Sequence, residues 1–314
     1  MAYAVGIDIG GTKVAIGIVG EEGQVCAQVV LPTDQDRTPA EMIDQICAQV
    51  ECLVNQSGIV PADLLGIGIG APGPLDKGRG LIACPPNLPG WIDVPIVETV
   101  QRKTLLPVVL ENDANAAALA EKWIGAARDS EHFVYVTIST GIGAGLFLDG
   151  KLASGSRGNA GDIGHMVIDP AYGTCPCGQK GCLEWIASGT AISRRGSELL
   201  GAPCTTQEIF ERYRAGHAQV AALVHETFTA IGIGCVTLIN LFDPERIVIG
   251  GGVSQVGAPL FQAVQQYVSR HALNPAGRRT TITPALLRQN AGVIGAAALI
   301  LLQQQGGGQR CPIL

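Results

Sequence analysis

Two segments of this chain, about one domain length apart, share the same pattern. Residues 5–19, VGIDIGGTKVAIGIV, align without gaps on residues 134–148, VYVTISTGIGAGLFL. In each segment an apolar run, a turn containing glycine and a second apolar run follow one another, as in two strands joined by a tight turn. A spacing of 129 residues is too long for a solenoid repeat. The repeat therefore predicts an internal duplication, with two domains of the same fold.

The composition fits two compact domains and excludes several classes of protein. Of the 314 residues 47% are hydrophobic and 15% charged, as in a globular chain and unlike a disordered one. The net charge of −6, without any run of Lys and Arg, argues against nucleic acid as the main partner. We expect no membrane span and no signal peptide, because we find no long uninterrupted apolar run and no basic N-terminal stretch. The cysteines are then expected to be reduced thiols in the cytoplasm.

The remaining pattern alternates strands with helices and predicts an α/β fold. Apolar positions recur at helical spacing in residues 39–57, and the mostly apolar stretches 220–241 and 290–302 also predict helices. Shorter segments predict three more strands, at 64–69, 107–110 and 246–249, and two more helices, at 114–124 and 259–269.

Two domains of unequal size are expected. The smaller one comprises residues 1–116, and a C-terminal helix at about 298–314 is expected to return to it. The larger one comprises residues 117–297 and contains a cluster of cysteines. The tail from Gln303 has low complexity, and we expect it to be mobile.

This cluster consists of His165, Cys175, Cys177 and Cys182 in the pattern H-x9-C-x-C-x4-C. Three thiols and an imidazole at this spacing match the ligands of a closed, tetrahedral structural zinc site. The alternative is a loop of free cytosolic thiols, but the cysteines elsewhere in the chain show no comparable grouping. We therefore predict bound zinc. Two carboxylates flank the cluster and suggest that the metal shapes a substrate site, namely those of Asp162 and Glu184.

A polar triplet, Glu111-Asn112-Asp113, separates the strand predicted at 107–110 from the helix predicted at 114–124. Asn and Asp are preferred N-cap residues, so one of them is expected to cap this helix. A carboxylate at the end of a strand can also act as a general base that accepts a proton from an alcohol. The two interpretations are compatible if Asn112 and Asp113 take different roles.

Glycine-rich turns follow three of the predicted strands. Asp8 ends the first strand, beside Gly10 and Gly11, whose backbone N–H groups can approach an anion closely. The second copy has its own turn at residues 139–141, so two similar domains could hold the phosphates of a nucleotide from both sides of a cleft. Gly250-Gly251-Gly252 would let the backbone pass close to a flat or anionic ligand. The alternative for the two hairpin turns is a duplication that binds no ligand. The alternative for Gly250-Gly251-Gly252 is a simple entry to the next helix.

The sequence resembles sugar kinases of the repressor–ORF–kinase (ROK) family, within the actin-like ATPase superfamily. The resemblance implies an α/β fold in which two duplicated, ribonuclease H-like domains flank a cleft. PPNLPGW and ENDANAAALAE most resemble bacterial glucokinases, and N-acetylmannosamine kinases share the cysteine segment. The matching segments cover nearly the whole chain in order: DIGGTK (8–13), GAPGPLD (70–76), PPNLPGW (85–91), ENDANAAALAE (111–121), STGIGAG (139–145), AGDIGHM (160–166), CPCGQKGCLE (175–184) and IVIGGGVS (247–254).

The resemblance also implies roles for individual residues. Asp113 would be the base that activates the sugar 6-hydroxyl, Asp8 would lie near Mg²⁺, and His165 would bind zinc with one ring nitrogen and a sugar hydroxyl with the other. The zinc would be structural. The sugar would contact Gly73, Asn87, Asn112, Asp113, Asp162, His165 and Glu184. ATP would contact Asp8, Gly10, Gly11, Thr12, Lys13, Thr140, Gly141, Gly251 and Gly252.

One departure affects the choice of sugar. The family usually has Glu in the ExGH motif where this chain has Asp162, a carboxylate shorter by one methylene. An ATP-dependent hexose kinase acting on the 6-hydroxyl of glucose is the leading hypothesis, and a kinase of N-acetylated or amino hexoses is the alternative. A sugar-sensing repressor is disfavoured, because no DNA-binding domain fits ahead of Asp8. A non-catalytic sugar-binding protein is disfavoured by the intact Asp8, Asp113 and hairpins. The resemblance also implies a homodimer or a homotetramer.

Overall fold

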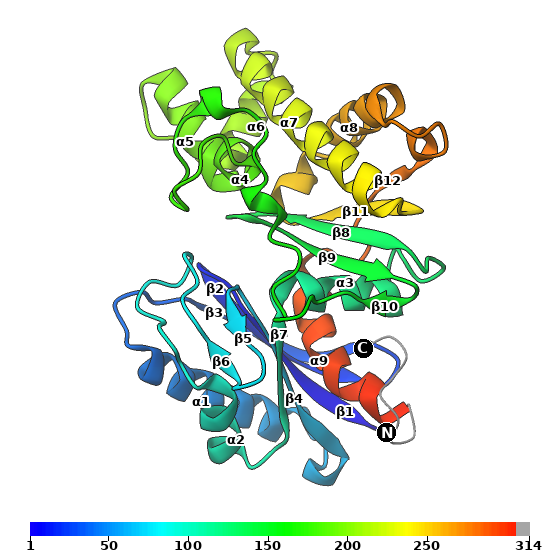
Figure 1. Cartoon of the computed structure of the whole chain (residues 1–314). Coiled ribbons are helices and arrows are strands. Elements are labelled where there is room, and N and C mark those ends of the chain that lie inside the picture. The colour runs from blue at the N-terminus through cyan, green and yellow to red at the C-terminus, as the bar shows by residue number, and fades with distance from the viewer. Residues whose placement is uncertain (306–314) are drawn as a thin grey trace. The chain divides into compact units, whose positions relative to one another are not determined.

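The computed structural model describes residues 1–305, and these form two compact units (Figure 1). Unit 1 comprises Met1–Asp129, Gly145–Gly161 and the described residues from Leu286 onward. Unit 2 comprises Ser130–Ala144 and Asp162–Ala285. The boundary expected between residues 116 and 117 falls inside helix α3 (Asp113–Trp123). The internal contacts keep all of this helix in unit 1, where it packs on helix α9 (Ala291–Gln305).

A five-stranded sheet forms the centre of unit 1, in the order β3-β2-β1-β4-β7. β1 pairs in parallel with β4, and β4 pairs in parallel with β7, while β2 and β3 continue the sheet in antiparallel fashion. β1 is buried along almost its whole length, as expected for an apolar central strand. The strands are β1 (Tyr3–Ile9), β2 (Lys13–Gly20), β3 (Val25–Pro32), β4 (Leu64–Ala71) and β7 (Val108–Asn112). A short antiparallel pair, β5 (Leu75–Asp76) and β6 (Leu81–Ile82), follows β4.

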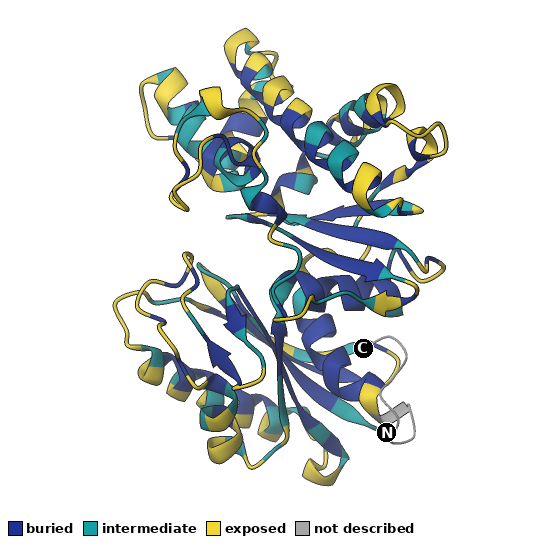
Figure 2. Ribbon diagram, viewed as in Figure 1, coloured by how far each residue is buried: buried dark blue, intermediate teal, exposed yellow. Residues whose placement is uncertain are grey.

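Helices cover both faces of this sheet. α1 (Pro39–Ser57) and α2 (Ile96–Thr104) share one apolar core with it, and α3 (Asp113–Trp123) and α9 (Ala291–Gln305) contribute to the other. Figure 2 shows the sheet in the buried colour and the outer faces of α1 and α2 in the exposed colour. α9 lies very close to the sheet: a Cβ added at Gly68 would be 1.7 Å from the carbonyl oxygen of Ala296.

A second five-stranded sheet, most of which belongs to unit 2, repeats the order of the first one; β10 and the end of β9 belong to unit 1. Its order is β10-β9-β8-β11-β12, so the first strand of each sheet lies between its hairpin partner and a parallel strand that comes later in the chain. β8 and β12 both pair in parallel with β11. The predicted duplication is therefore confirmed at the level of topology. The strands are β8 (Phe133–Ile138), β9 (Ile142–Leu148), β10 (Lys151–Leu152), β11 (Arg246–Gly250) and β12 (Thr281–Pro284), and the units divide within β9.

Unit 2 also contains a group of helices that pack on one another. In residues 1–305, α7 is the one helix whose length and composition would allow it to cross a membrane. In its most apolar window, 61% of the residues are buried inside the protein, as in the core helix of a globular domain. The helices are α4 (Leu183–Ala187), α5 (Gly189–Leu200), α6 (Thr206–Arg214), α7 (Ala218–Phe242) and α8 (Ala258–His271).

The C-terminal segment differs from the expectation in part. The predicted helix at 290–302 is α9, which continues through Gln305, so the first residues of the predicted mobile tail are helical. α9 belongs to unit 1 and packs on β1, β4 and α3. Residues 306–314, which include most of the tail and the end of the helix expected at about 298–314, lie outside the described residues.

Candidate functional site

The carboxyl ends of three parallel strands meet at one edge of the unit 1 sheet. Asp8 of β1 pairs with Gly70 of β4, and Gly70 pairs with Glu111 of β7. The residues that follow these positions, Gly73 and the Asn112-Asp113 pair, therefore leave the sheet at the same edge as Asp8. Ligands of open α/β sheets bind outside the carboxyl ends of the strands. The structure thus brings together three of the predicted site segments, which are distant in sequence.

Asn112 and Asp113 begin α3 in different roles. Asn112 is the N-cap: its Oδ1 accepts from the backbone N–H groups of Ala114, at 3.0 Å, and Asn115, at 3.2 Å. This confirms that one residue of the triplet caps the helix. Because Oδ1 serves as the cap, the Nδ2 group of Asn112 is left to donate to a ligand. Asp113 is the first residue of the helix, and its Oδ1 accepts from Ala114 N–H at 2.8 Å.

The carboxyl group of Asp8 is surrounded by protein although the residue as a whole is only partly buried. It faces the first turn of α9, where a Cβ added at Gly292 would lie 2.2 Å from Asp8 Oδ2. The pKa of Asp8 is raised from 3.8 to about 7. Burial is the larger cause and the negative charge of Asp113 the second, while the positive charge of Lys13 lowers the pKa. Position 292 therefore has to be glycine if Asp8 is to keep this place.

The raised pKa of Asp8 predicts a pH-dependent stability that Asp8→Asn removes. In the unfolded chain this carboxyl ionises near pH 3.8, whereas in the folded protein it holds its proton up to about pH 7. The folded state is therefore favoured at low pH, and the advantage is lost as the pH rises from about 4 through 7. The amide of the variant does not ionise, so the variant does not lose this stability as the pH rises. We expect its thermal midpoint, relative to the wild type, to be higher at pH 8 than at pH 4.5 in magnesium-free buffer.

The difference corresponds to a few kcal/mol at most, since one pKa unit is about 1.4 kcal/mol. Asp36→Asn is the matched control, because Asp36 is exposed. If the thermal midpoints of Asp8→Asn and the wild type differ by the same amount at both pH values, the expectation is contradicted.

The first hairpin turn lies against another predicted site segment. Gly10 N–H donates to Lys13 O at 2.9 Å, and Thr33 Oγ1 donates to Gly10 O at 2.7 Å, so the turn is held by the residue that follows β3. A Cβ added at Gly11 would be 2.7 Å from the carbonyl oxygen of Asn87. The turn predicted to contact ATP and a residue predicted to contact the sugar are thus neighbours in unit 1. Asn87, Thr12 and Lys13 are exposed.

Sequence reasoning missed an ion pair beside Asp113. Lys77 Nζ contacts Glu111 Oε2, and Glu111 is only 4% exposed. The other oxygen of Glu111 accepts from Asn112 N–H at 2.9 Å and from Asn115 Nδ2 at 3.1 Å. Glu111 therefore fixes the backbone immediately before the proposed base. The only signal in the sequence was a charged residue at the end of an apolar strand, which does not indicate its partner.

The four predicted metal ligands of unit 2 converge. Their ligand atoms all lie within 4.8 Å of one another. Cys177 Sγ is 3.6 Å from Cys182 Sγ, and Cys175 Sγ is 3.9 Å from His165 Nδ1. Ligands about 2.3 Å from a tetrahedral zinc lie about 3.8 Å apart, so the arrangement fits this ion. His165 faces the cluster with Nδ1, which leaves Nε2 for another partner.

The thiols interact strongly with one another. Burial first, and then hydrogen bonds with Cys177 and Cys175, raise the pKa of Cys182 to about 12. A backbone hydrogen bond from Gln179 is the main reason that the pKa of Cys177 is lowered. A divalent cation stabilises thiolates, so a metal ion would remove the penalty that the close thiols impose on ionisation. The donor set and its spacing thus match structural zinc, which would hold the loop at residues 165–182 in place.

The cluster ends directly at the helix that carries Glu184. Cys182 is the N-cap of α4, and Glu184 is in its first turn. Asp162 is exposed and precedes a short 3₁₀ helix, Ile163–His165. Unit 2 also holds Thr140 and Gly141 between β8 and β9, and Gly251 and Gly252 after β11. The predicted residues are therefore divided between the two units: unit 1 carries Asp8 to Lys13, Gly73, Asn87, Asn112 and Asp113, and unit 2 carries the others.

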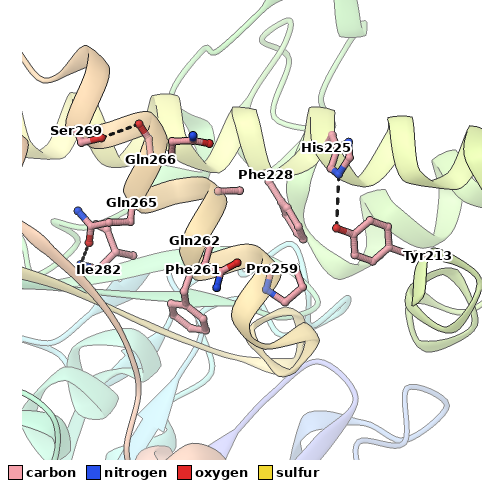
Figure 3. A pocket seen from close by; sticks show the side chains of 11 residues that line it. Tyr213, His225, Phe228, Pro259, Phe261, Gln262, Gln265, Gln266, Ser269 and Ile282 are labelled. Carbon is pink, nitrogen blue, oxygen red and sulfur yellow. Dashed lines mark hydrogen bonds between the residues drawn. The ribbon is translucent and has the colours of Figure 1, made fainter. Parts of the chain in front are cut away.

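A shallow groove of about 910 Å³ lies elsewhere in unit 2 (Figure 3). It contains none of the predicted site residues, and its polar groups largely bond to one another or to backbone; for example, Tyr213 Oη and His225 Nε2 are 3.5 Å apart. Its lining comes from α6, α7, α8 and β12: Tyr213, His225, Phe228, Pro259, Phe261, Gln262, Ala263, Gln265, Gln266, Ser269 and Ile282.

Comparison with known proteins agrees with this geometry. The sequence profile of the ROK family matches residues 4–303. The chain belongs to the ROK family. Its fold is the duplicated α/β fold of actin-like ATPases, which ROK sugar kinases of known structure share.

Relatives of this ROK protein include enzymes named for different sugars. It is 33% identical to a glucokinase from Thermotoga maritima, over 94% of this chain and 96% of that protein. It is 35% identical to an N-acetylmannosamine kinase from Escherichia coli, over 93% of this chain and 96% of that protein. The crystal structure of a ROK family glucokinase from Streptomyces griseus, in complex with glucose and AMPPNP, matches with a TM-score of 0.83 and 32% identity. The match covers 95% of this chain and 99% of the Streptomyces griseus chain.

Proposed function

We propose that this ROK protein is an ATP-dependent hexose kinase that phosphorylates the 6-hydroxyl of glucose. The observation that carries the proposal is the edge of the unit 1 sheet, where Asp8 near the end of β1 and the Asn112-Asp113 pair at the end of β7 lie on either side of the parallel strand β4. A carboxylate at a helix start, supported by a buried ion pair and next to an amide donor, has the components that transfer of a phosphoryl group to an alcohol requires. A relative crystallised with glucose and AMPPNP supports the choice of substrates.

The proposed reaction uses Asp113 as the base. Its carboxylate accepts the proton of the sugar 6-hydroxyl as the oxygen forms a bond to the γ-phosphorus of ATP, and the bond to the bridging oxygen breaks to release ADP. The amide of Asn112 would donate to neighbouring hydroxyls and orient the sugar. Asp8 offers carboxylate oxygens, the ligands that Mg²⁺ prefers, and Mg²⁺ bound with the nucleotide would neutralise phosphate charge.

Unit 2 would supply the remaining contacts to the two substrates. Glu184, Asp162 and His165 Nε2 are proposed to bind the sugar, and the metal loop would keep His165 and Glu184 in place. The turn at Thr140-Gly141 is proposed to bind phosphate, and the glycines after β11 to lie along the adenosine. Although Asp162 is exposed as a residue, partial burial of its carboxyl group raises its pKa, against the charge of the nearby His165, so that this shorter carboxyl binds its proton more tightly than usual.

Phosphorylation of an N-acetylhexosamine is the second candidate. It is favoured by the identity of 35% with an N-acetylmannosamine kinase and by Asp162, whose shorter side chain leaves more room near the sugar than Glu would. A hydrogen bond lost at this position would cost about 1–3 kcal/mol with a buried partner, enough to change sugar preference tenfold. A non-catalytic sugar-binding protein is the remaining alternative. The cytoplasmic location and the homo-oligomer stay predictions.

The test is the release of ADP from Mg-ATP in the presence of individual sugars. The panel contains glucose, mannose, fructose, allose, glucosamine, N-acetylglucosamine and N-acetylmannosamine. We expect glucose to give the highest kcat/KM. A higher kcat/KM with N-acetylmannosamine would favour the second candidate, a kinase of N-acetylhexosamines. Sugar binding without turnover, with ATP or with polyphosphate as the donor, would identify a non-catalytic binder.

A further inference from the structure

The turn between β8 and β9 is held by the helix that follows the metal loop. Ile142 N–H, at the end of this turn, donates to Glu184 Oε2 at 2.7 Å. A Cβ added at Gly164 would be 2.4 Å from the carbonyl oxygen of Ile142 and 3.2 Å from Glu184 Cβ. Glu184 of α4 and the start of β9 therefore come together beside Gly164, where a side chain would not fit. No other described residue donates to Glu184 Oε1, so one oxygen of this carboxylate serves the turn and the other is left for a ligand.

The start of α5 holds the other side of the same turn. Gly189 N–H donates to Ser139 O at 2.7 Å, and Thr190 Oγ1 donates to Thr140 O at 2.9 Å. Here too the approach depends on glycine, since a Cβ added at Gly189 would be 2.7 Å from the carbonyl oxygen of Ser139. Both bonds engage carbonyl oxygens. Ser139 N–H donates to Gly141 O at 2.9 Å, so the backbone N–H groups that can be oriented towards an anion are those of Thr140 and Gly141.

We propose that Thr190, Gly189 and Glu184 are positioning residues for nucleotide binding. They hold the backbone of the Ser139–Gly141 turn in the conformation that receives phosphate. This inference rests on the proposed function, because it takes the turn to be a phosphate site. Thr190 lies outside every motif segment on which the family resemblance rests.

The physical reason is the entropy of a short turn. A turn of this kind, with two exposed residues followed by a glycine, has several accessible backbone conformations, and only those with converging N–H groups bind an anion well. Ordering the turn in advance removes part of this entropic cost from the binding step. Two bonds to carbonyl oxygens and one to an N–H group, from two different helices, restrict the turn at both ends.

Thr190→Val tests this role because it removes the hydroxyl and keeps the shape of the side chain. We expect the Kd for Mg-ADP, measured by calorimetry, and the KM for ATP to rise about threefold, as for loss of one hydrogen bond of about 0.6 kcal/mol. The KM for the sugar is expected to stay unchanged. Thr190→Ser keeps the hydroxyl and should restore wild-type values. Thr229→Val is the control, because the Thr229 hydroxyl donates to the carbonyl oxygen of His225, at 2.9 Å, within α7.

Gly189→Ala is a second, stronger variant. Its methyl group would displace the carbonyl of Ser139, and we expect the Kd for Mg-ADP to rise tenfold or more. If this variant does not fold, Thr190→Val still decides. A Kd in Thr190→Val equal to that of Thr229→Val, in a protein whose wild type binds Mg-ADP, would overturn the inference and leave the proposed function intact. A wild type that neither binds nor hydrolyses nucleotide would overturn both.

Discussion

Asp113→Asn is expected to lower kcat by about 10²- to 10⁴-fold, the range that a positioned general base contributes. The amide cannot accept the proton of the sugar hydroxyl, so the attacking oxygen would have to lose it to water. The helix should survive the change, because Asp113 accepts from Ala114 N–H through Oδ1, and the carbonyl oxygen of Asn can accept the same bond. Steady-state kinetics with ATP and the preferred sugar, together with a thermal unfolding scan, measure both effects.

The binding of sugar separates loss of the base from loss of the site. We expect the Kd for the sugar, measured by calorimetry without nucleotide, to change by less than about tenfold, because Asn112 and its cap are untouched. Asp36→Asn serves as the control for the substitution itself, since Asp36 is exposed. A kcat within threefold of the wild type would exclude Asp113 as the base.

The second large effect is expected from the metal loop. Purified protein should contain about one zinc per chain, and Cys177→Ser should lose most of it, because a hydroxyl is a much weaker zinc ligand than a thiolate. Cys177 is exposed, so its replacement removes almost no buried contact, and a fall in stability reports the metal. We expect the thermal midpoint to fall by at least about 5 °C, as for a loss of some 2 kcal/mol or more in a chain of this size.

Cys84→Ser is the matched control, since Cys84 is also exposed and lies in unit 1, outside the cluster. Metal content by mass spectrometry and the thermal midpoint are compared for the three proteins. Loss of zinc should also weaken sugar binding, because the loop carries His165 and leads into Glu184. Wild-type protein that binds no zinc when supplied with it would contradict the predicted metal site.

The sequence by itself determined the elements whose residues repeat at a regular spacing. The apolar runs of the two repeated segments are the strands β1, β2, β8 and β9, and the helix predicted at 39–57 is α1. The order of the motifs also determined the family and the duplicated fold. These features follow from local periodicity and from short segments. The cysteine cluster could be predicted for the same reason, because its ligands lie within one loop.

Elements with a weaker local signal were not predicted. β3 alternates half-buried and exposed residues at the edge of the sheet, and the short helices α4, α5 and α6 are partly polar. Propensity is a weak guide for such segments, since packing decides whether they are ordered. Their absence from the prediction concealed how α4 and α5 reach the Ser139–Gly141 turn.

Only the tertiary structure decided the environment of the proposed catalytic groups. Asp8 owes its raised pKa to burial and to Asp113, and its place to a glycine of α9 near the other end of the chain. Lys77 meets Glu111 across the sheet edge, and Gly11 meets Asn87. Each of these contacts joins segments that are distant in sequence. They depend on which strands become neighbours and how closely the helices pack on them, and no local pattern in the chain specifies that.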